Sequence, residues 1–392
     1  MLNISKHLNF TLFIVVLMAS FTLQAQQTSV SEFLHRSRNR YEQTICLPVN
    51  QWPTLHFVLG NESADLDSIA SSIAYAYLNN AIPLLNITKA ELSLRKDTLY
   101  LFDLLKISKD DLLFLDDGIP FDILLSNKKL RITLVDHNRL RSSQEAFAPF
   151  VEAIVDHHFD ENQRYPLLTN ENKTIMTVGS TATLIAEKAK EDAISPDLAV
   201  LLLGAILMDT ANLNSKEKTK EKDKQAVATL RKIGSSVIPS DFYDKLVAAK
   251  NDIAGLTPAM LLSKDFKAYS DGDIVYGISS MPQSVSWWSG DEEALLPILE
   301  QFSRERNLSW LIVLMHNQEP QGPKRKILVY SQSEKLVNAF AAYVKTDETL
   351  NKILLPGPAA ADKRLLFYVS PKALARKELQ PLLQQLPSNL GS

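Results

Sequence analysis

The sequence predicts an α/β fold with two domains: an N-terminal domain with a mostly parallel sheet, and a smaller C-terminal α/β domain. Three observations favour this fold class. Short apolar runs alternate with stretches of helical periodicity up to about residue 212. The pattern changes near residue 240, and a chain of 392 residues is long enough for two cores. Acidic and imidazole side chains directly follow several of the apolar runs.

Three apolar runs in the first half are typical of buried strands. Residues 54–60 form a short run that ends in glycine, and residues 131–138 and 152–158 each carry a β-branched apolar segment before an aspartate. Runs of this length that are apolar throughout are expected where both faces of a sheet are covered. These three runs are therefore expected to pair within the N-terminal sheet.

Helical stretches lie between and after these runs. Residues 67–80 repeat apolar side chains at helical spacing, and Asp67 or Ser68 could cap this helix. Residues 180–193 begin with a serine that could cap a second helix, and residues 198–212 are long and apolar enough for a buried helix. The alternation of strands and helices favours parallel pairing of the strands.

The second half of the chain again combines strand-like apolar runs with helical stretches, which predicts a second α/β domain. The domain boundary is expected near residues 234–241, which gives an N-terminal domain of residues 26–238 and a C-terminal domain of residues 239–392. The charge run at residues 214–224 is expected to be an exposed loop before a helix. The expected elements of the second domain are strands at residues 273–281, 309–317 and 325–331 and a helix at residues 292–305.

The N-terminus resembles a signal peptide that spans residues 1–25. Residues 10–23 are apolar over the length of an h-region, and Ala25 could precede the cleavage site. A membrane anchor usually needs a longer apolar run, so an anchor and a buried helix are the weaker alternatives. We expect an exported protein, periplasmic or secreted, that leaves the membrane after cleavage.

Composition excludes several other classes of site. The net charge of −3 gives no reason to expect nucleic acid or anionic membrane as a partner. The single cysteine, Cys46, cannot form an internal disulfide or a cysteine-based zinc cluster. No histidine stands near it in the sequence, which argues against a catalytic thiol.

Several metal-capable side chains stand at the ends of separate apolar elements. In open α/β sheets the ligand site lies beyond the carboxyl ends of the strands, so these side chains are expected to gather there. Clustered carboxylates repel one another unless cations neutralise them, and oxygen donors with one or two imidazoles suit Mn²⁺ or Mg²⁺. The residues are Asp65, Asp67, Asp136, Asp156, His157, His158 and Asp209.

Each motif alone has an ordinary structural explanation. The acids at 65 and 67 could cap a helix, Asp136 could form an Asx turn, and adjacent histidines occur on surfaces. Asp209 could cap the following turn. Their ordered occurrence at four separate elements favours the metal site over four independent coincidences.

The four motifs in order resemble those of the DHH phosphoesterases. They read "GNESADLDS" (60–68), "LVDHN" (134–138), "VDHH" (155–158) and "ILMDTANL" (206–213). Their spelling is similar to the exopolyphosphatase and Prune branch. The related family II pyrophosphatases have a histidine where this chain has Asn61. The second half resembles the DHHA2 domain, and no "GGGH" signature of the oligonucleotide-degrading branch is present.

The resemblance implies a site for two divalent ions. Asp136 would bridge the ions, and Asp67, His157 and Asp209 would complete the first. Asp65 would hold the second, with Asn61 either as a weaker ligand or as a group that orients water or substrate. His158 would face the substrate as a hydrogen-bond donor or acid, and Asp156 would orient a histidine.

The resemblance also implies a cationic substrate site in the second domain. The segments "LLSKDFKAY" (261–269) and "ARKELQPLL" (375–383) resemble the DHHA2 phosphate-binding segments. They assign substrate phosphate to Lys264, Lys267, Arg376 and Lys377. Taken singly, such residues are usually solvated surface charges. An active site in a cleft between the domains would explain how an acidic protein binds a polyanion.

The expected activity is metal-dependent hydrolysis of inorganic polyphosphate from its end, with release of orthophosphate. Pyrophosphate, short phosphoanhydrides and nucleoside polyphosphates are the closest alternative substrates. Cyclic nucleotides are more distant. A Prune-like regulatory protein with little activity is the alternative from another class, although every acidic ligand is present.

Overall fold

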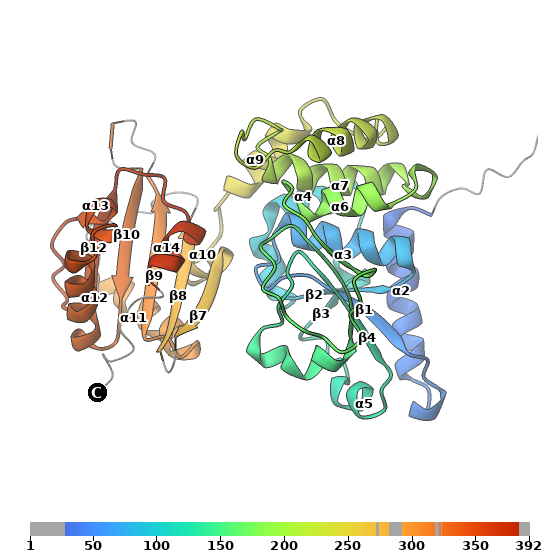
Figure 1. The fold of residues 1–392 in the computed structure, drawn as a ribbon, viewed down its shortest axis with the longest axis horizontal. Coiled ribbons are helices and arrows are strands. Elements are labelled where there is room, and N and C mark those ends of the chain that lie inside the picture. Colours follow the sequence, from blue (N-terminus) through green and yellow to red (C-terminus); the bar gives the residue numbers. More distant parts are fainter. Residues whose placement is uncertain (1–27, 272–273, 282–291, 318–320, 323, 384–392) are drawn as a thin grey trace, which may run out of the picture.

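The computed structural model describes residues 28–271, 274–281, 292–317, 321–322 and 324–383. Two domains lie side by side, each built around a six-stranded sheet (Figure 1). The α/β fold class with two sheets is confirmed.

The N-terminal sheet is parallel at every strand pair, in the order β3-β2-β1-β4-β5-β6. Both faces are covered: Phe57 and Val58 are neighbours in one strand yet enter cores on opposite faces. The strands are β1 (Leu55–Leu59), β2 (Ile82–Leu85), β3 (Leu113–Phe114), β4 (Leu130–Val135), β5 (Val151–Asp156) and β6 (Lys173–Ile175).

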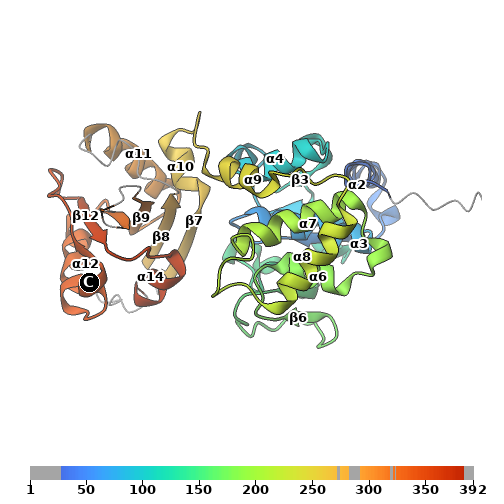
Figure 2. The ribbon, with the colours of Figure 1, turned by 90° about the horizontal axis from the view of Figure 1, so that it is seen from above.

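Some helices of this domain pack directly on the strands, and others pack mainly on those helices. Helix α3 packs on the sheet, α6 contacts both α3 and β5, and α7 and α8 lie on the outer side of α3 and α6 (Figures 1 and 2). The helices of this domain are α2 (Val30–Ile45), α3 (Leu66–Asn79), α4 (Lys96–Leu104), α5 (Phe121–Ser126), α6 (Thr181–Lys188), α7 (Pro196–Asp209), α8 (Glu221–Ile233) and α9 (Phe242–Asn251). The 3₁₀ segment η2 (Ala90–Leu94) precedes α4, and η4 (Ser142–Phe150) precedes β5.

Two helices, α7 and α3, bear directly on the site. Helix α7 is buried from Leu198 to Leu207, as the apolar sequence predicts for a helix inside a layered core. The expected cap of α3 was wrong: its N-cap is Asp65, whose carboxylate accepts the backbone N–H of Ser68 at 3.1 Å. Asp67 therefore lies in the first turn with its carboxylate free for other partners.

The second sheet has the order β11-β12-β10-β9-β8-β7 and is antiparallel except between β8 and β9. Helices α12, α13 and α14 pack on one face, and α10 and α11 pack on the other. Its strands are β7 (Phe266–Asp271), β8 (Ile274–Met281), β9 (Trp310–His316), β10 (Arg325–Tyr330), β11 (Leu355–Pro356) and β12 (Leu365–Ser370). Its helices are α10 (Pro258–Lys264), α11 (Glu292–Glu305), α12 (Glu334–Thr346), α13 (Leu350–Ile353) and α14 (Arg376–Leu383).

The connection between the two cores runs through residues 252–257. Helix α9 begins after the boundary expected at residue 238, yet Phe242 and Leu246 are buried in the N-terminal core against α4 and α7. The Nζ atom of Lys96 then donates to Oδ2 of Asp252 at 2.7 Å and to the carbonyl oxygen of Ala254 at 2.7 Å. The start of the connecting segment is thus tied to the N-terminal domain.

The charge run at residues 214–224 is not wholly the exposed loop that was expected. Asp223 is fully buried and accepts the backbone N–H of Gly179 at 2.9 Å and the hydroxyl of Thr183 at 2.6 Å. A charged residue buried this deeply needs such donors. This carboxylate therefore anchors the start of α8 to the start of α6.

The signal peptide expected at residues 1–25 lies outside the described residues. Within the part of the chain that the structure describes, none of the helices has the length and apolar character that crossing a bilayer requires.

Candidate metal centre

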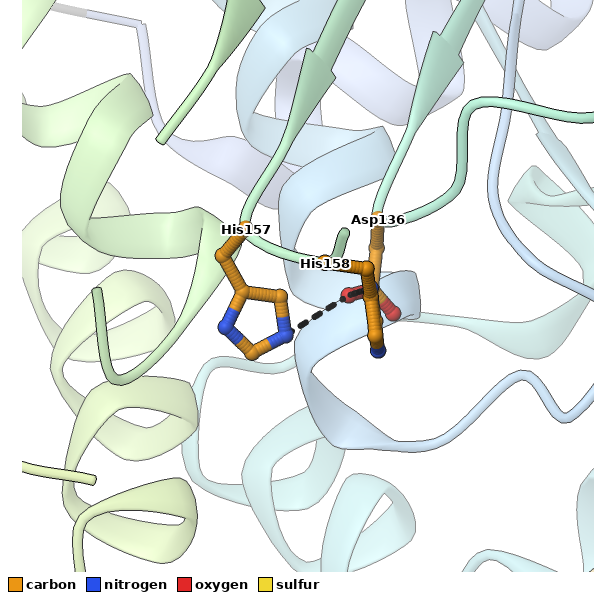
Figure 3. A group of neighbouring side chains, drawn as sticks. All are labelled: Asp136, His157 and His158. Atoms are coloured by element: carbon orange, nitrogen blue, oxygen red, sulfur yellow. Dashed lines mark ion pairs between the residues drawn. The ribbon is translucent and has the colours of Figure 1, made fainter. Parts of the chain in front are cut away.

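Three metal-capable side chains meet where β4 and β5 end. Asp136 follows β4, and His157 and His158 follow β5, so parallel pairing brings them to one edge of the sheet (Figure 3). The Nε2 atom of His157 lies 3.4 Å from Oδ1 of Asp136, and the Nδ1 atom of His158 lies 3.7 Å from the same oxygen. This group of atoms is close enough to hold one metal ion.

The backbone of Asp136 is in the left-handed region, with a φ of 62°. Its N–H still donates to the carbonyl oxygen of Val155 at 3.0 Å, so it remains attached to the neighbouring strand. Aspartate and asparagine tolerate this conformation better than other side chains except glycine. A strained residue of this kind at a strand end is typical of functional sites.

The ring of His157 is oriented by a backbone contact. Its Nδ1 atom lies 3.1 Å from the carbonyl oxygen of Val178, which accepts the Nδ1 proton. This leaves Nε2 directed at Asp136 and, at 3.9 Å, at Oδ2 of Asp67. Metal-binding histidines commonly have one nitrogen held in this way while the other binds the ion.

Asp67 is fixed by the N-terminus of α6. Its Oδ1 atom accepts hydrogen bonds from the hydroxyl of Ser180 at 2.7 Å and the N–H of Ala182 at 3.0 Å. Its Oδ2 atom accepts the N–H of Thr181 at 2.7 Å. A helix N-terminus stabilises a carboxylate, so these donors hold Asp67 in place beside His157.

Asp209 and Asp65 lie within electrostatic reach of the same site. Asp209 ends α7, and after its C-cap Thr210 the residues 211–213 all have positive φ values of 51–65°, which turns the chain sharply. Burial raises the pKa of Asp209 well above its ordinary value, and the charges of Asp67 and Asp65 raise it further. Asp65 is exposed, because its position as N-cap of α3 places it at the surface.

Asn61 contacts the expected bridging carboxylate directly. Its side-chain amide donates to Oδ2 of Asp136 at 2.5 Å, while its Oδ1 atom accepts the N–H of Ser63 at 2.9 Å and that of Ala64 at 3.1 Å. The residue thus closes the turn between β1 and α3. In this arrangement the amide nitrogen faces the site, which favours an orienting role over a ligand role.

Asp156 holds His158 in a defined orientation. It is fully buried, and its Oδ1 atom accepts both the backbone N–H of His158 at 3.1 Å and the ring Nδ1 proton at 2.8 Å. Its other oxygen accepts the amide of Asn138 at 2.6 Å. The His158 side chain is 55% exposed, so its remaining nitrogen is open to a ligand.

The buried carboxylates make this site short of positive charge. Burial raises the pKa of Asp136 well above its ordinary value, and the charge of Asp67 adds to this rise. Burial lowers the pKa of His157, but the hydrogen bond to Asp136 and the charges of Asp67 and Asp136 outweigh it and raise the pKa to about 10. A divalent cation would replace these protons. The donor set of carboxylate oxygens and imidazole nitrogen fits Mn²⁺ or Mg²⁺.

Comparison with known families agrees with this geometry. A model of the DHH family, N-terminal domain, matches residues 56–206, and a model of the DHHA2 domain matches residues 244–386. A Schizosaccharomyces pombe protein named as a candidate exopolyphosphatase is 30% identical, over 93% of this chain and 99% of that protein. This chain belongs to the DHH family.

Other relatives of this DHH-family protein carry two kinds of name. The exopolyphosphatase PRUNE1 of Rattus norvegicus is 30% identical over 84% of this chain and 75% of its own length. A manganese-dependent inorganic pyrophosphatase of Methanocaldococcus jannaschii is 27% identical over 80% of this chain and 97% of its own length. The crystal structure of a candidate family II inorganic pyrophosphatase from Methanococcus jannaschii has the same fold, with a TM-score of 0.58 at 24% identity, over 85% of this chain and 99% of that one.

Two of the four expected phosphate-binding cations of this DHH-family chain are ion-paired. Arg376 donates to Oδ1 of Asp265 at 2.6 Å, and it lies within electrostatic reach of Asp65 across the domain boundary. The Nζ atom of Lys377 lies 3.6 Å from Oε1 of Glu217, which belongs to the N-terminal domain. The proximity of Arg376 to Asp65 and the ion pair between Lys377 and Glu217 place α14 near the acidic site, but neither cation contacts the group of Asp136, His157 and His158.

The other two cations lie on α10 and β7. The Nζ atom of Lys264 donates to the carbonyl oxygen of Leu94 at 3.1 Å, so this side chain is engaged with the N-terminal domain. Lys267 lies over the ring of Tyr269, with Nζ 5.9 Å from its centroid. Burial lowers the pKa of His137 to about 4, and the charge of Lys267 contributes to this, so Lys267 lies near the residue that follows Asp136.

Several residues near the site of this DHH-family protein were missed by the sequence analysis. Thr181 and Ala182 bind Asp67, but an N-terminal helix turn gives no sequence signal of which carboxylate it will meet. Lys250 lies near the end of α9, where desolvation lowers the pKa of its amine but the charges of Asp97 and Asp209 outweigh it and raise the pKa. Arg95 is buried at the domain boundary. Only the tertiary structure brings these residues to the site.

Proposed function

We propose that this protein hydrolyses terminal phosphoanhydride bonds of inorganic polyphosphate and releases orthophosphate. The observation that carries the proposal is the group of two buried carboxylates, Asp136 and Asp67, with His157, beside an exposed His158 that Asp156 holds in place. The exopolyphosphatase names of the relatives support polyphosphate as the substrate. Of the four cations expected in the second domain, Lys267, Arg376 and Lys377 would provide positive charge for a polyanion.

The expected metal ligands are Asp67, Asp136, His157 and Asp209 for one ion and Asp136 and Asp65 for a second. Divalent cations there, Mn²⁺ or Mg²⁺, would neutralise phosphate oxygens and lower the pKa of an attacking water. The manganese-dependent pyrophosphatase relatives favour Mn²⁺. Asn61 would orient a water or a phosphate oxygen through its amide, which now contacts Asp136.

His158 would act on the leaving phosphate. Its Nδ1 proton is committed to Asp156 at 2.8 Å, so a hydrogen bond or proton for the leaving phosphate would come from Nε2 of the ring when both nitrogens are protonated. Phosphoryl transfer depends chiefly on positioning and on neutralising charge. Arg376 and Lys377, and also Lys267, would therefore bind the phosphates that leave or remain in the chain, with Arg376 suited to bidentate contact.

Pyrophosphate and other short phosphoanhydrides are the second candidate substrates, favoured by the pyrophosphatase relatives. We also propose that the mature protein acts outside the cytoplasm, on the basis of the apolar residues 10–23.

The test is orthophosphate release from long-chain polyphosphate by protein that begins at residue 26, with Mn²⁺ or Mg²⁺ and a chelator control. Pyrophosphate, tripolyphosphate and a cyclic nucleotide are assayed in parallel. Fast release from the polymer that the chelator stops, with little release from pyrophosphate, is the expected result. Release from short substrates alone would favour the second candidate. No release from any substrate would favour a regulatory binding protein.

A further inference from the structure

Arg95 is a buried cation at the boundary between the two domains. It lies between η2 and α4 and is 6% exposed. Its guanidinium donates to three backbone carbonyl oxygens: Nε to Ala64 at 2.9 Å, Nη2 to Ser63 and Nη1 to Lys264. The planar guanidinium group of Arg95 thus bonds to two segments that are far apart in the sequence.

The first two carbonyls belong to the turn that carries expected site residues. Ser63 and Ala64 lie between Asn61 and Asp65, and Ala64 has a positive φ of 41°. The amide of Asn61 closes the same turn from the other side by binding the N–H groups of both residues. The turn is therefore held by Asn61 facing the site and by Arg95 facing the domain boundary.

The third carbonyl belongs to the second domain, and the contact runs in both directions. Lys264 ends α10, and its Nζ atom donates back to the carbonyl oxygen of Leu94, the residue before Arg95. The next residue, Asp265, is the ion-pair partner of Arg376. The joint formed by Arg95 and Lys264 therefore connects the turn at 61–65 to the segment that positions an expected phosphate-binding arginine.

Burial of a guanidinium without a direct carboxylate partner is costly, which marks this contact as a specific one. Burial lowers the pKa of Arg95, and the nearby charges of Asp65 and Asp265 oppose this effect. Asp65 comes from the N-terminal domain and Asp265 from the second. The docked arrangement of the domains is thus the one in which Arg95 is surrounded by its compensating groups.

We propose that Arg95 is a positioning residue that fixes the turn carrying Asn61 and Asp65 only when the second domain is docked. Contact of Lys264 with Arg95 would then be transmitted through the carbonyls of Ser63 and Ala64 to the second metal position. The inference rests on the proposed function in one respect, since it assigns Asp65 to a metal ion that acts in turnover. The mechanical link itself is independent of the substrate.

The test compares Arg95→Met and Arg95→Lys with Lys96→Met in the full chain. Lys96 is the matched control, because within the described part of the chain this neighbouring cation bonds only to Asp252 and Ala254 of the connecting segment and to neither the turn at 61–65 nor Lys264. Hydrogen exchange is measured for peptides that cover residues 61–65 and 258–267, with Mn²⁺ titration and polyphosphate kinetics alongside.

Arg95→Met is expected to speed exchange in both peptides and to weaken the looser Mn²⁺ site by about tenfold or more, the usual effect of losing a supporting contact. The value of kcat should fall in parallel, with KM nearly unchanged. Arg95→Lys should restore part of each effect, and Lys96→Met should leave exchange at residues 61–65 as in the parent. A general loss of stability would instead speed exchange in distant strands such as β9 and β10.

The proposal is overturned if Arg95→Met leaves exchange at residues 61–65 and Mn²⁺ binding equal to those of Lys96→Met. If Arg95→Met does not fold, the Arg95→Lys comparison decides in the same way. Failure of the proposed function looks different. In that case the parent protein would not release phosphate from any substrate, while exchange and Mn²⁺ titration would still report on the joint.

Discussion

His157 and Asp136 face each other with 3.4 Å between Nε2 and Oδ1, while Nδ1 of the same ring is tied to a backbone carbonyl. Two consequences follow from this geometry. The ring presents one defined nitrogen to the site, and the proton it carries there is shared with a buried carboxylate. Any cation that enters must displace that proton.

Metal affinity is expected to rise with pH. The pKa of His157 is raised to about 10 without metal, so at pH 7 the ring is protonated and a proton must leave when Mn²⁺ binds. At pH values below that pKa, the Mn²⁺ affinity rises about tenfold per pH unit for each proton that binding releases. Calorimetry in buffers of different ionisation enthalpy measures the proton count. Affinity that stays constant between about pH 6 and 8 would contradict this assignment.

Asp136→Asn is expected to abolish metal-dependent turnover, by about a thousandfold or more, without destabilising the metal-free protein. The substitution removes a buried charge whose neighbours are also acidic, and asparagine tolerates the left-handed backbone at this position. Phosphate release and thermal unfolding with chelator measure the two effects. Asp103→Asn, on the exposed surface of α4, is the matched control. Unfolding of Asp136→Asn at a much lower temperature would indicate a structural role instead.

His158→Gln should lower kcat by about 10²–10⁴-fold, the range for loss of a general acid, while Mn²⁺ affinity stays close to that of the parent. Asn138→Ala should have a smaller effect in the same direction, because it loosens Asp156 and so the ring of His158. Steady-state kinetics and Mn²⁺ titration separate the two quantities. A large loss of Mn²⁺ binding in His158→Gln would place this ring on the metal.

Arg376→Gln is expected to raise KM for polyphosphate more than it lowers kcat, and to reduce the dependence of KM on salt. The guanidinium is now paired with Asp265, so it is held near the site and can exchange that partner for phosphate. Arg304→Gln removes a surface arginine of the same domain that pairs with Glu300, and it serves as the control. Equal KM values in the two variants would remove Arg376 from the substrate site.

The apolar residues 10–23 predict a signal peptide that is cleaved after Ala25. Expression of the full chain in a Gram-negative host should give periplasmic protein whose first residue is Gln26 by N-terminal sequencing. Replacement of Leu17 by arginine should block export by breaking the apolar run. Soluble cytosolic protein that retains residues 1–25 would refute export.

The sequence was most informative where one residue type answers one local requirement. The apolar runs predicted the parallel sheet because strands buried on both faces need apolar residues throughout, and the aspartates behind them marked the strand ends. The apolar length of α7 likewise predicted a buried helix. The acids at positions 136 and 156 and the histidines at 157 and 158 fall at adjacent strand ends for the same reason.

Features that depend on partners distant in the sequence were harder to predict from the sequence. The cap of α3 was assigned to Asp67 or Ser68, because a run of possible caps does not reveal which carboxylate α6 will bind. Asp223 belongs to a charge run that is typical of an exposed loop, yet its carboxylate is buried and accepts hydrogen bonds from three donors. Lys264 was expected to face phosphate, whereas its amine donates to the N-terminal domain in the docked arrangement.

The expected ligands enter the site from the start of α3, the ends of β4 and β5, and the end of α7. An ion held by all four would fasten segments that span most of the N-terminal domain at a single point. Such fastening favours the folded chain by mass action, since the unfolded chain cannot assemble the same ligands. The lifetime of the folded domain would then depend on how slowly the ion dissociates, and a strong chelator would promote unfolding.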